Sequence, residues 1–318
     1  NFHNEIKEFT DNKVFKCEEN ACSAFELIKN VLIGFFIKKG YYNIRIKRMQ
    51  NHETELIEGE ICDNEFDIEN FVTIFKFNSN SLITLSYNLI NEELYVIKQS
   101  KEAQLQREKE CLKRMKILHP YRLKYFGHLK ENDGIVLEFI DGEALKDYDL
   151  KKLTFSEKIS IIINIMTSIE DIHFSKIIHR DISPENIIIN ENKTAVIIDY
   201  NYSRIEKSDD DTEYTSNIGK EYFTSPEQKN SNTYTNKTDI YSFGKIMYFI
   251  ITDKTENFSS FKNEFKHILP IYENCVSEDP SDRMNISELI NRFYHKIFKN
   301  YQKELFNKNK IKESLVEL

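Results

Sequence analysis

The sequence of 318 residues has few cysteines and no long apolar run, and both shortages exclude classes of protein. Its five cysteines are odd in number and form no C-x-x-C pair, so the sequence indicates neither a disulfide framework nor a zinc site. The longest apolar run, 31–37, is interrupted by Gly34 and is too short to cross a bilayer. We therefore expect no transmembrane segment and a reducing compartment, which is the cytoplasm or, for a pathogen's protein, the host cell into which it is delivered.

Basic residues are fewer than acidic residues. The chain has 44 Lys and Arg against 52 Asp and Glu, which gives a net charge of −8. Because its lysines are interleaved with acidic residues, it lacks the broad positive field that binds nucleic acid, and we expect no nucleic-acid partner. Charged residues at 30% and hydrophobic residues at 40% are typical of a soluble globular protein, and the length predicts about two domains.

Periodicity divides most of the chain into a strand-rich part followed by a helix-rich part. Residues 70–98 alternate between apolar and polar with two polar breaks, which predicts a strand meander, and two more strands are expected before residue 140. Apolar residues recur at helical spacing over 101–117, and a largely buried helix is expected from Phe155 onwards. This order predicts an α+β architecture with two lobes.

The first 69 residues fall outside this pattern. A helix over 21–38 and strands over 41–49 and 54–57 are expected there. We interpret residues 1–69 as an N-terminal extension, of unknown role, packed against the first lobe.

Two short apolar runs predict a β-hairpin with polar residues at its outer ends. Runs 187–189 and 195–198 are rich in β-branched residues and are separated by a polar turn. Asn186 and Asp199 then lie at the ends of paired strands, and Asp181 lies on the loop that leads into the first strand. Such a set can hold a Mg²⁺–nucleotide complex and orient a hydroxyl for phosphoryl transfer. The alternative is a hairpin whose polar ends arose by chance.

This stretch begins His179-Arg180-Asp181 and resembles the catalytic loop and metal-binding motif of protein kinases, H-R-D-x-x-x-x-N followed by D-F-G. The resemblance implies a bilobal kinase fold, ATP with Mg²⁺ (or Mn²⁺) as cofactors, and a protein as the phosphate acceptor. In the family, Asp181 would orient the acceptor hydroxyl and accept its proton, and Asn186 and Asp199 would bind the metal.

The family also requires a lysine and a glutamate in the first lobe. Lys98 ends an apolar strand and resembles the lysine of V-A-I-K, which bridges the α- and β-phosphates. Its partner should be a glutamate of the next helix. Glu108 shares the helical face of Leu105 and Leu112, whereas Glu110 is rotated by about 200° from it. We prefer Glu108, with Glu110 as the alternative.

Further motifs resemble the family in the second lobe. Residues 224–227 resemble the A-P-E end of an activation segment, in which Glu227 would pair with Arg283. Asp239 resembles the helix residue that fixes the backbone of the catalytic loop. Small-molecule kinases share the Asp/Asn/Asp set but lack these features, which favours a protein kinase.

The nucleotide site is expected between the lobes. Residues 135–142 resemble the last strand of the first lobe and the hinge, where the backbone of Glu138 and Ile140 would bond adenine beside the gatekeeper Leu137. Leu85 would line the same site.

The resemblance covers residues 70–299. It divides them into a first lobe at 70–140 and a second lobe at 141–299, followed by a charged helix or tail at 300–318.

The sequence departs from the family where glycine is expected. The nucleotide-covering loop at 78–83 contains none, and Asn78 and Asn80 are partial substitutes because Asn tolerates the left-handed region better than other non-glycine residues. D-F-G is replaced by Asp199-Tyr200-Asn201, which keeps the metal ligand.

Two further departures concern charge near the catalytic aspartate. Ser183 stands where serine/threonine kinases usually carry a lysine, and Lys220 stands where the activation segment usually carries a threonine. Lys220 can supply the charge that Ser183 lacks, and the alternative is an ordinary surface lysine.

These residues predict an ATP- and Mg²⁺-dependent serine/threonine-type protein kinase with an unidentified protein substrate. The alternatives are a pseudokinase that serves as a nucleotide-binding scaffold and a kinase-fold enzyme of another transfer, such as nucleotidylation. The segment 203–224 is expected to be regulatory, ordered by phosphorylation and read by Arg180; the alternative is an acidic loop that needs no modification. The candidate phosphorylation sites are Thr212, Tyr214, Thr215 and Ser216.

Overall fold

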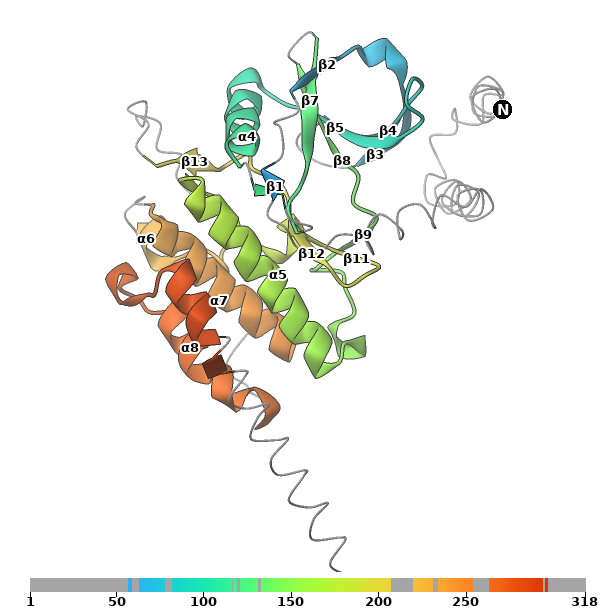
Figure 1. Ribbon diagram of the computed structural model, residues 1–318. Helices are drawn as coiled ribbons and strands as arrows, with labels where there is room; N and C mark the ends of the chain where they lie inside the picture. The colour runs from blue at the N-terminus through green and yellow to red at the C-terminus, as the bar shows by residue number, and fades with distance from the viewer. Residues whose placement is uncertain are drawn as a thin grey trace, which may run out of the picture.

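The computed structural model describes residues 57–58, 63–77, 82–115, 117–118, 121–130, 133–206, 220–230, 234–253, 263–293 and 295–296. Figure 1 shows a strand-rich lobe with helix α4 (Glu102–Arg114) beside its sheet, and a second lobe of helices that includes α5 (Phe155–Phe174). This arrangement confirms the predicted α+β fold with two lobes.

The first lobe is built on a six-stranded sheet in the order β2-β7-β8-β5-β4-β3. All neighbouring strands are antiparallel except β2 and β7, which are parallel. The strands are β2 (Asn64–Phe66), β3 (Phe71–Phe77), β4 (Leu82–Asn88), β5 (Leu94–Gln99), β7 (Tyr125–Leu129) and β8 (Gly134–Glu138). The expected boundary at residue 70 leaves β2 outside the lobe, whereas its pairing with β7 places it in the sheet. The sequence did not indicate β2, because a strand of three residues is too short to show alternation between apolar and polar residues.

Helix α4 packs through an apolar face that includes one carboxylate. Leu105, Glu108, Leu112 and Met115 are all buried, and they recur at the three- and four-residue spacing of one helical face. After the helix, β6 (Ile117–Leu118) pairs with β1 (Ile57–Glu58) in a separate two-stranded ladder.

The second lobe is helical. Helix α5 begins with a capping box in which Thr154 and Glu157 satisfy each other's backbone groups. It packs with α7 (Asn236–Thr252), and α7 packs with α8 (Leu269–Cys275). The remaining elements are α6 (Pro226–Asn230) and the 3₁₀ turns η1 (Ile68–Asn70), η2 (Leu150–Lys152), η3 (Pro184–Asn186), η4 (Asn263–Ile268) and η5 (Pro280–Asp282).

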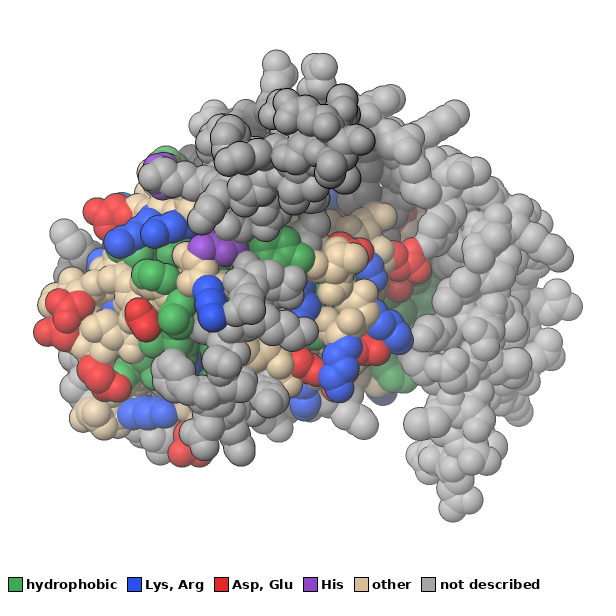
Figure 2. Space-filling model, turned by 90° about the horizontal axis from the view of Figure 1, so that it is seen from below, with side chains coloured by type: hydrophobic (Ala, Val, Ile, Leu, Met, Phe, Trp, Pro, Cys, Tyr) green, Lys and Arg blue, Asp and Glu red, His purple; other side chains and the backbone are tan. Residues whose placement is uncertain are grey.

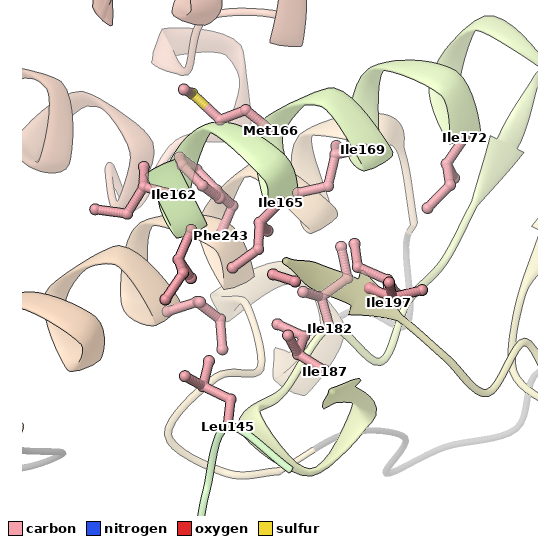
Figure 3. Close-up of a cluster of buried hydrophobic side chains, with 14 of the residues drawn as sticks. Leu145, Ile162, Ile165, Met166, Ile169, Ile172, Ile182, Ile187, Ile197 and Phe243 are labelled. Carbon is pink, nitrogen blue, oxygen red and sulfur yellow. The ribbon is translucent and has the colours of Figure 1, made fainter. Parts of the chain in front are cut away.

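The predicted hairpin is present between the lobes. Strands β11 (Ile187–Asn190) and β12 (Ala195–Ile197) pair antiparallel, and β9 (Gly142–Ala144) adds a third strand. Two short strands that the sequence did not predict also pair with each other. They are β10 (Ile177–Ile178), which precedes the hairpin in the chain, and β13 (Arg204–Ile205), which follows it. Figure 3 shows the apolar side chains of the hairpin packed against α5 and α7; the labelled residues are Leu145, Ile162, Ile165, Met166, Ile169, Ile172, Ile182, Ile187, Ile197 and Phe243. The hairpin is therefore anchored on the helical core.

Acidic and basic side chains are interspersed over the described part of the face in Figure 2. In the described ranges, no helix combines the length and apolarity needed to span a bilayer. Cys111 and Cys275 are buried free thiols. The helix expected over 21–38, the strand over 41–49 and the tail at 300–318 lie outside the described residues.

Candidate active site

The hairpin sets the positions of two candidate metal ligands. Ile187 pairs with Ile197, and the N–H of Ile198 donates to the backbone oxygen of Asn186 at 2.8 Å. Asn186 precedes one strand and Asp199 follows the other, as the sequence predicts. Asp199 has φ of +65°, a conformation that directs the chain away from the strand and that few non-glycine residues adopt.

Asp181 and Asn186 are joined directly. The Nδ2 of Asn186 donates to the backbone oxygen of Asp181 at 2.9 Å and to its Oδ2 at 2.8 Å. The other carboxylate oxygen, Oδ1, is buried and has no hydrogen-bond partner among the described residues. Burial and the charge of Asp199 raise the pKa of Asp181 to about 6. The carboxylate is therefore ionised at neutral pH yet more basic than an exposed aspartate.

Lys98 joins the two lobes through a pair of carboxylates. Its Nζ lies 2.9 and 2.8 Å from the two oxygens of Glu108 on α4, and 2.7 Å from Oδ1 of Asp199. Burial alone would lower the pKa of Lys98, but the two carboxylates raise it, so the ammonium stays charged. Glu108 also accepts the N–H of Tyr200 at 3.1 Å, whereas Glu110 is exposed. The structure thus pairs Lys98 with Glu108 and not with Glu110.

The donor set fits Mg²⁺. Asn186 uses its NH₂ group on Asp181, which leaves its carboxamide oxygen as the remaining polar atom, and Asp199 supplies a carboxylate. Among the described residues, no three His, Cys, Asp or Glu side chains converge as a metal site. Mg²⁺ commonly relies on one or two protein oxygens together with substrate phosphates and water, so two ligands suffice.

Asp239 on α7 fixes the backbone of the catalytic loop. It is fully buried and accepts the N–H groups of His179 and Arg180, each at 2.9 Å. Sequence reasoning missed its third partner, His173 at the end of α5, whose Nε2 lies 2.9 Å from the same carboxylate. The available signal was a histidine four residues after Ile169, on the buried face of the helix.

The end of the activation segment is fixed by the predicted ion pair. Glu227 and Arg283 form a bidentate contact, with nitrogen–oxygen distances of 2.7 and 2.9 Å; Arg283 is buried and the Glu227 side chain is only 9% exposed. Sequence reasoning missed Gln228, which donates to the backbone oxygen of Arg180 at 3.0 Å and accepts from Ser225. Gln228 therefore connects this segment to the catalytic loop.

Ser183 and Lys220 occupy different environments. Ser183 is fully buried, and its hydroxyl has no hydrogen-bond partner among the described residues. The Lys220 side chain is 56% exposed, its Nζ lies 3.8 Å from Glu185, and its charge acts on Asp181 to lower the aspartate's pKa. Lys220 therefore lies near the catalytic loop, and its role there stays a prediction.

The predicted nucleotide-binding residues are only partly described. Leu137 and Ile140 are buried, and Glu138 ends β8 with its N–H donating to the backbone oxygen of Lys124 at 2.9 Å. Leu85 is half-buried on β4, opposite Val96 of β5.

Asn78 and Asn80, in the loop that would cover the nucleotide, lie outside the described residues. Thr212, Tyr214, Thr215 and Ser216, the candidate phosphorylation sites, lie outside them too.

Comparisons with known proteins agree with this geometry. The family model of the protein kinase domain matches residues 90–313. A probable serine/threonine-protein kinase of Dictyostelium discoideum is 28% identical over 194 residues, which are 59% of this chain and 32% of the relative. The serine/threonine-protein kinase PrkC of Bacillus subtilis is 27% identical over 178 residues, 54% of this chain and 28% of the relative. A probable serine/threonine-protein kinase of Clostridium perfringens is 36% identical over 121 residues, which are 37% of this chain and 18% of the relative. The chain thus spans about a third or less of the length of these relatives.

Proposed function

The chain belongs to the protein kinase family, and from that premise we propose that it is an active serine/threonine-type protein kinase, which transfers the γ-phosphate of ATP to a protein hydroxyl. The observation that carries the proposal is the contact of Lys98 with both Glu108 and Asp199. Lys98 belongs to the first lobe and Asp199 to the second, so this contact assembles one charged site beside Asp181. The serine/threonine class is supported by the names of the relatives.

In this proposal Asp181 is the proton acceptor. Asn186 binds its Oδ2, which leaves the buried Oδ1 to accept a hydrogen bond from the acceptor hydroxyl and then its proton. The raised pKa of Asp181 suits that role, because proton transfer is more favourable to a more basic carboxylate. The backbone contacts of Asp239 keep the loop that carries Asp181 in place.

Lys98 would bind the phosphates, and its two carboxylates keep it both charged and oriented. Asn186 and Asp199 would hold Mg²⁺ through oxygen atoms. When bound, the metal neutralises charge on the transferring phosphate.

ATP labelled separately at the α- and γ-phosphates tests the proposal. With Mg²⁺ and a generic protein acceptor, we expect label from the γ-phosphate on serine or threonine, and Asp181→Asn as the matched control should transfer about 10²–10⁴ times more slowly. Label from the α-phosphate would indicate nucleotidylation instead. Absence of transfer together with nucleotide binding would indicate a pseudokinase.

A further inference from the structure

The segment 63–70, which precedes the residues matched to the kinase domain, is part of the first lobe. Strand β2 pairs in parallel with Gly127–Leu129 of β7, and Lys130 donates its N–H to the backbone oxygen of Phe66 at 2.9 Å. The approach is close, because a Cβ on Gly127 (φ +148°) would lie 2.0 Å from the backbone oxygen of Asn64. Only glycine fits there without strain. The backbone of this segment is therefore fixed on the edge of the sheet.

Asp63, the residue before β2, contacts side chains from two other elements. Its Oδ1 accepts the hydroxyl of Tyr125 at 2.7 Å and lies 3.1 Å from Nδ1 of His128, both on β7. Its Oδ2 pairs with the Nζ of Lys113 on α4. Partial burial acts to raise the pKa of Asp63, but these three partners lower it to about 2. The carboxylate therefore joins the sheet edge to α4 as a charged group.

Lys113 stands on the last turn of the helix that carries Glu108. The two residues are five positions apart, which is about 7.5 Å along a helix axis. The next residue, Arg114, donates from Nε to the backbone oxygen of Ser175 at 2.8 Å in the second lobe. A helix is stiff over this distance, so a restraint on its last turn also restricts the position of Glu108.

We propose that Asp63 is a positioning residue, which fixes the last turn of α4 to the sheet and so keeps Glu108 at Lys98. The effect of Asp63 on phosphate transfer rests on the proposed function. The effect of Asp63 on the position of α4 does not, because the contacts of Asp63 are independent of what the site catalyses.

The chain offers a matched control on the same segment. Asp67 follows β2, accepts the N–H of Glu69 at 3.2 Å and pairs with Lys130 at 3.2 Å. Neither partner belongs to α4. A general loss of acidic charge or of local order in the segment would affect Asp67→Asn as well, whereas a loss of the restraint on α4 would not.

The test uses the full chain with four variants: Asp63→Asn, Lys113→Met, the double variant and Asp67→Asn. Hydrogen exchange is measured for the amides of α4 and, as an internal reference, of α5, together with kcat for transfer from ATP. We expect each of the first two variants to speed exchange in α4 on the order of tenfold and to lower kcat similarly, with α5 unchanged. The double variant should show no faster exchange in α4 and no lower kcat than the more affected single variant, because both changes remove the same contact.

Equal α4 exchange in Asp63→Asn and Asp67→Asn would overturn the proposal, and so would fully additive effects of the Asp63 and Lys113 changes. If Asp63→Asn does not fold, the comparison of Lys113→Met with Asp67→Asn decides the same question. If the wild-type chain transfers no phosphate, the proposed function fails, and the exchange data alone still decide whether Asp63 restrains α4.

Discussion

Lys98 is a charged residue of the candidate site whose side chain is almost completely buried. Its ammonium is buried, and burial without compensation would discharge it. Glu108 and Asp199 supply the compensation from opposite lobes. Glu108 is itself fully buried, so the two groups depend on each other for their charge.

We predict that Glu108→Gln lowers kcat on the order of a hundredfold, because it leaves a buried ammonium with a single carboxylate partner. Glu110→Gln is the matched control, since Glu110 is exposed on the same helix and should leave kcat within about twofold. Steady-state kinetics of both variants make the comparison. Greater damage from Glu110→Gln would mean that the pair seen in the structure is not the one that supports activity.

The second prediction concerns the charge that Ser183 lacks. Lys220 lies near enough for its charge to act on Asp181, and it faces Glu185 at 3.8 Å. Lys220→Ala should cut kcat more than it weakens ATP binding, because its charge would act mainly in the transition state. The double change Ser183→Lys with Lys220→Thr should restore part of the loss. An unchanged kcat in Lys220→Ala would make this residue an ordinary surface lysine.

At the scale of elements, α7 supports the catalytic loop. Asp239 on the first turn of α7 accepts the backbone N–H groups of His179 and Arg180, and the middle of the same helix packs on α8. Gly244 lies at the contact with α8, where an added Cβ would come within 2.7 Å of Cys275 Cβ and 2.9 Å of Val276 Cγ1. The helix therefore has no room for a side chain at this position.

Gly244→Ala should lower the free energy of unfolding by about 1–3 kcal/mol through overpacking, despite the better helix propensity of alanine. Asn236→Ala, at the partly exposed start of the same helix, should change it by less than about 1 kcal/mol. Denaturant unfolding of the two variants measures the difference. If Gly244→Ala were as stable as the wild type, α7 and α8 would be able to move apart at this contact without lowering the free energy of unfolding, which would contradict the prediction.

The activation segment carries the fourth prediction. Arg180 is buried with its guanidinium 3.7 Å from the ring centroid of Tyr234, and within the described residues no carboxylate pairs with it. Burial lowers the pKa of Arg180, and the charges of Arg204 and Arg107 act in the same direction, so an added phosphate would be stabilised there.

We therefore expect that phosphorylation of the segment, at one of Thr212, Tyr214, Thr215 or Ser216, raises activity about tenfold or more. Phosphatase treatment followed by mass spectrometry and kinetics tests this, and Arg180→Gln should make activity insensitive to the treatment. Full activity of phosphate-free protein would mean that the acidic residues of the segment suffice.

At the scale of the whole molecule, the sequence predicted what is local and periodic. The hairpin, α4, α5 and the order of the lobes follow from patterns within single stretches. The resemblance to the family implies a glutamate partner for Lys98, and helical phase selects Glu108 rather than Glu110. The parallel strand β2 and the contacts of His173 and Asp63 were missed, because each depends on partners distant in the chain. No local pattern indicates that an aspartate at residue 63 will meet a lysine at residue 113.

The central claim is that Asp181 takes a proton during transfer of the γ-phosphate of ATP. The most direct measurement compares wild type with Asp181→Asn for γ-phosphate transfer in the presence of Mg²⁺, with the affinity for ATP and the unfolding midpoint measured on the same samples. We predict that transfer falls by about 10²–10⁴ while ATP affinity is kept, because Asn preserves the shape but cannot accept the proton. The unfolding midpoint should not fall, since the change removes a buried charge beside Asp199. A folded Asp181→Asn protein with near-wild-type transfer would contradict the assignment.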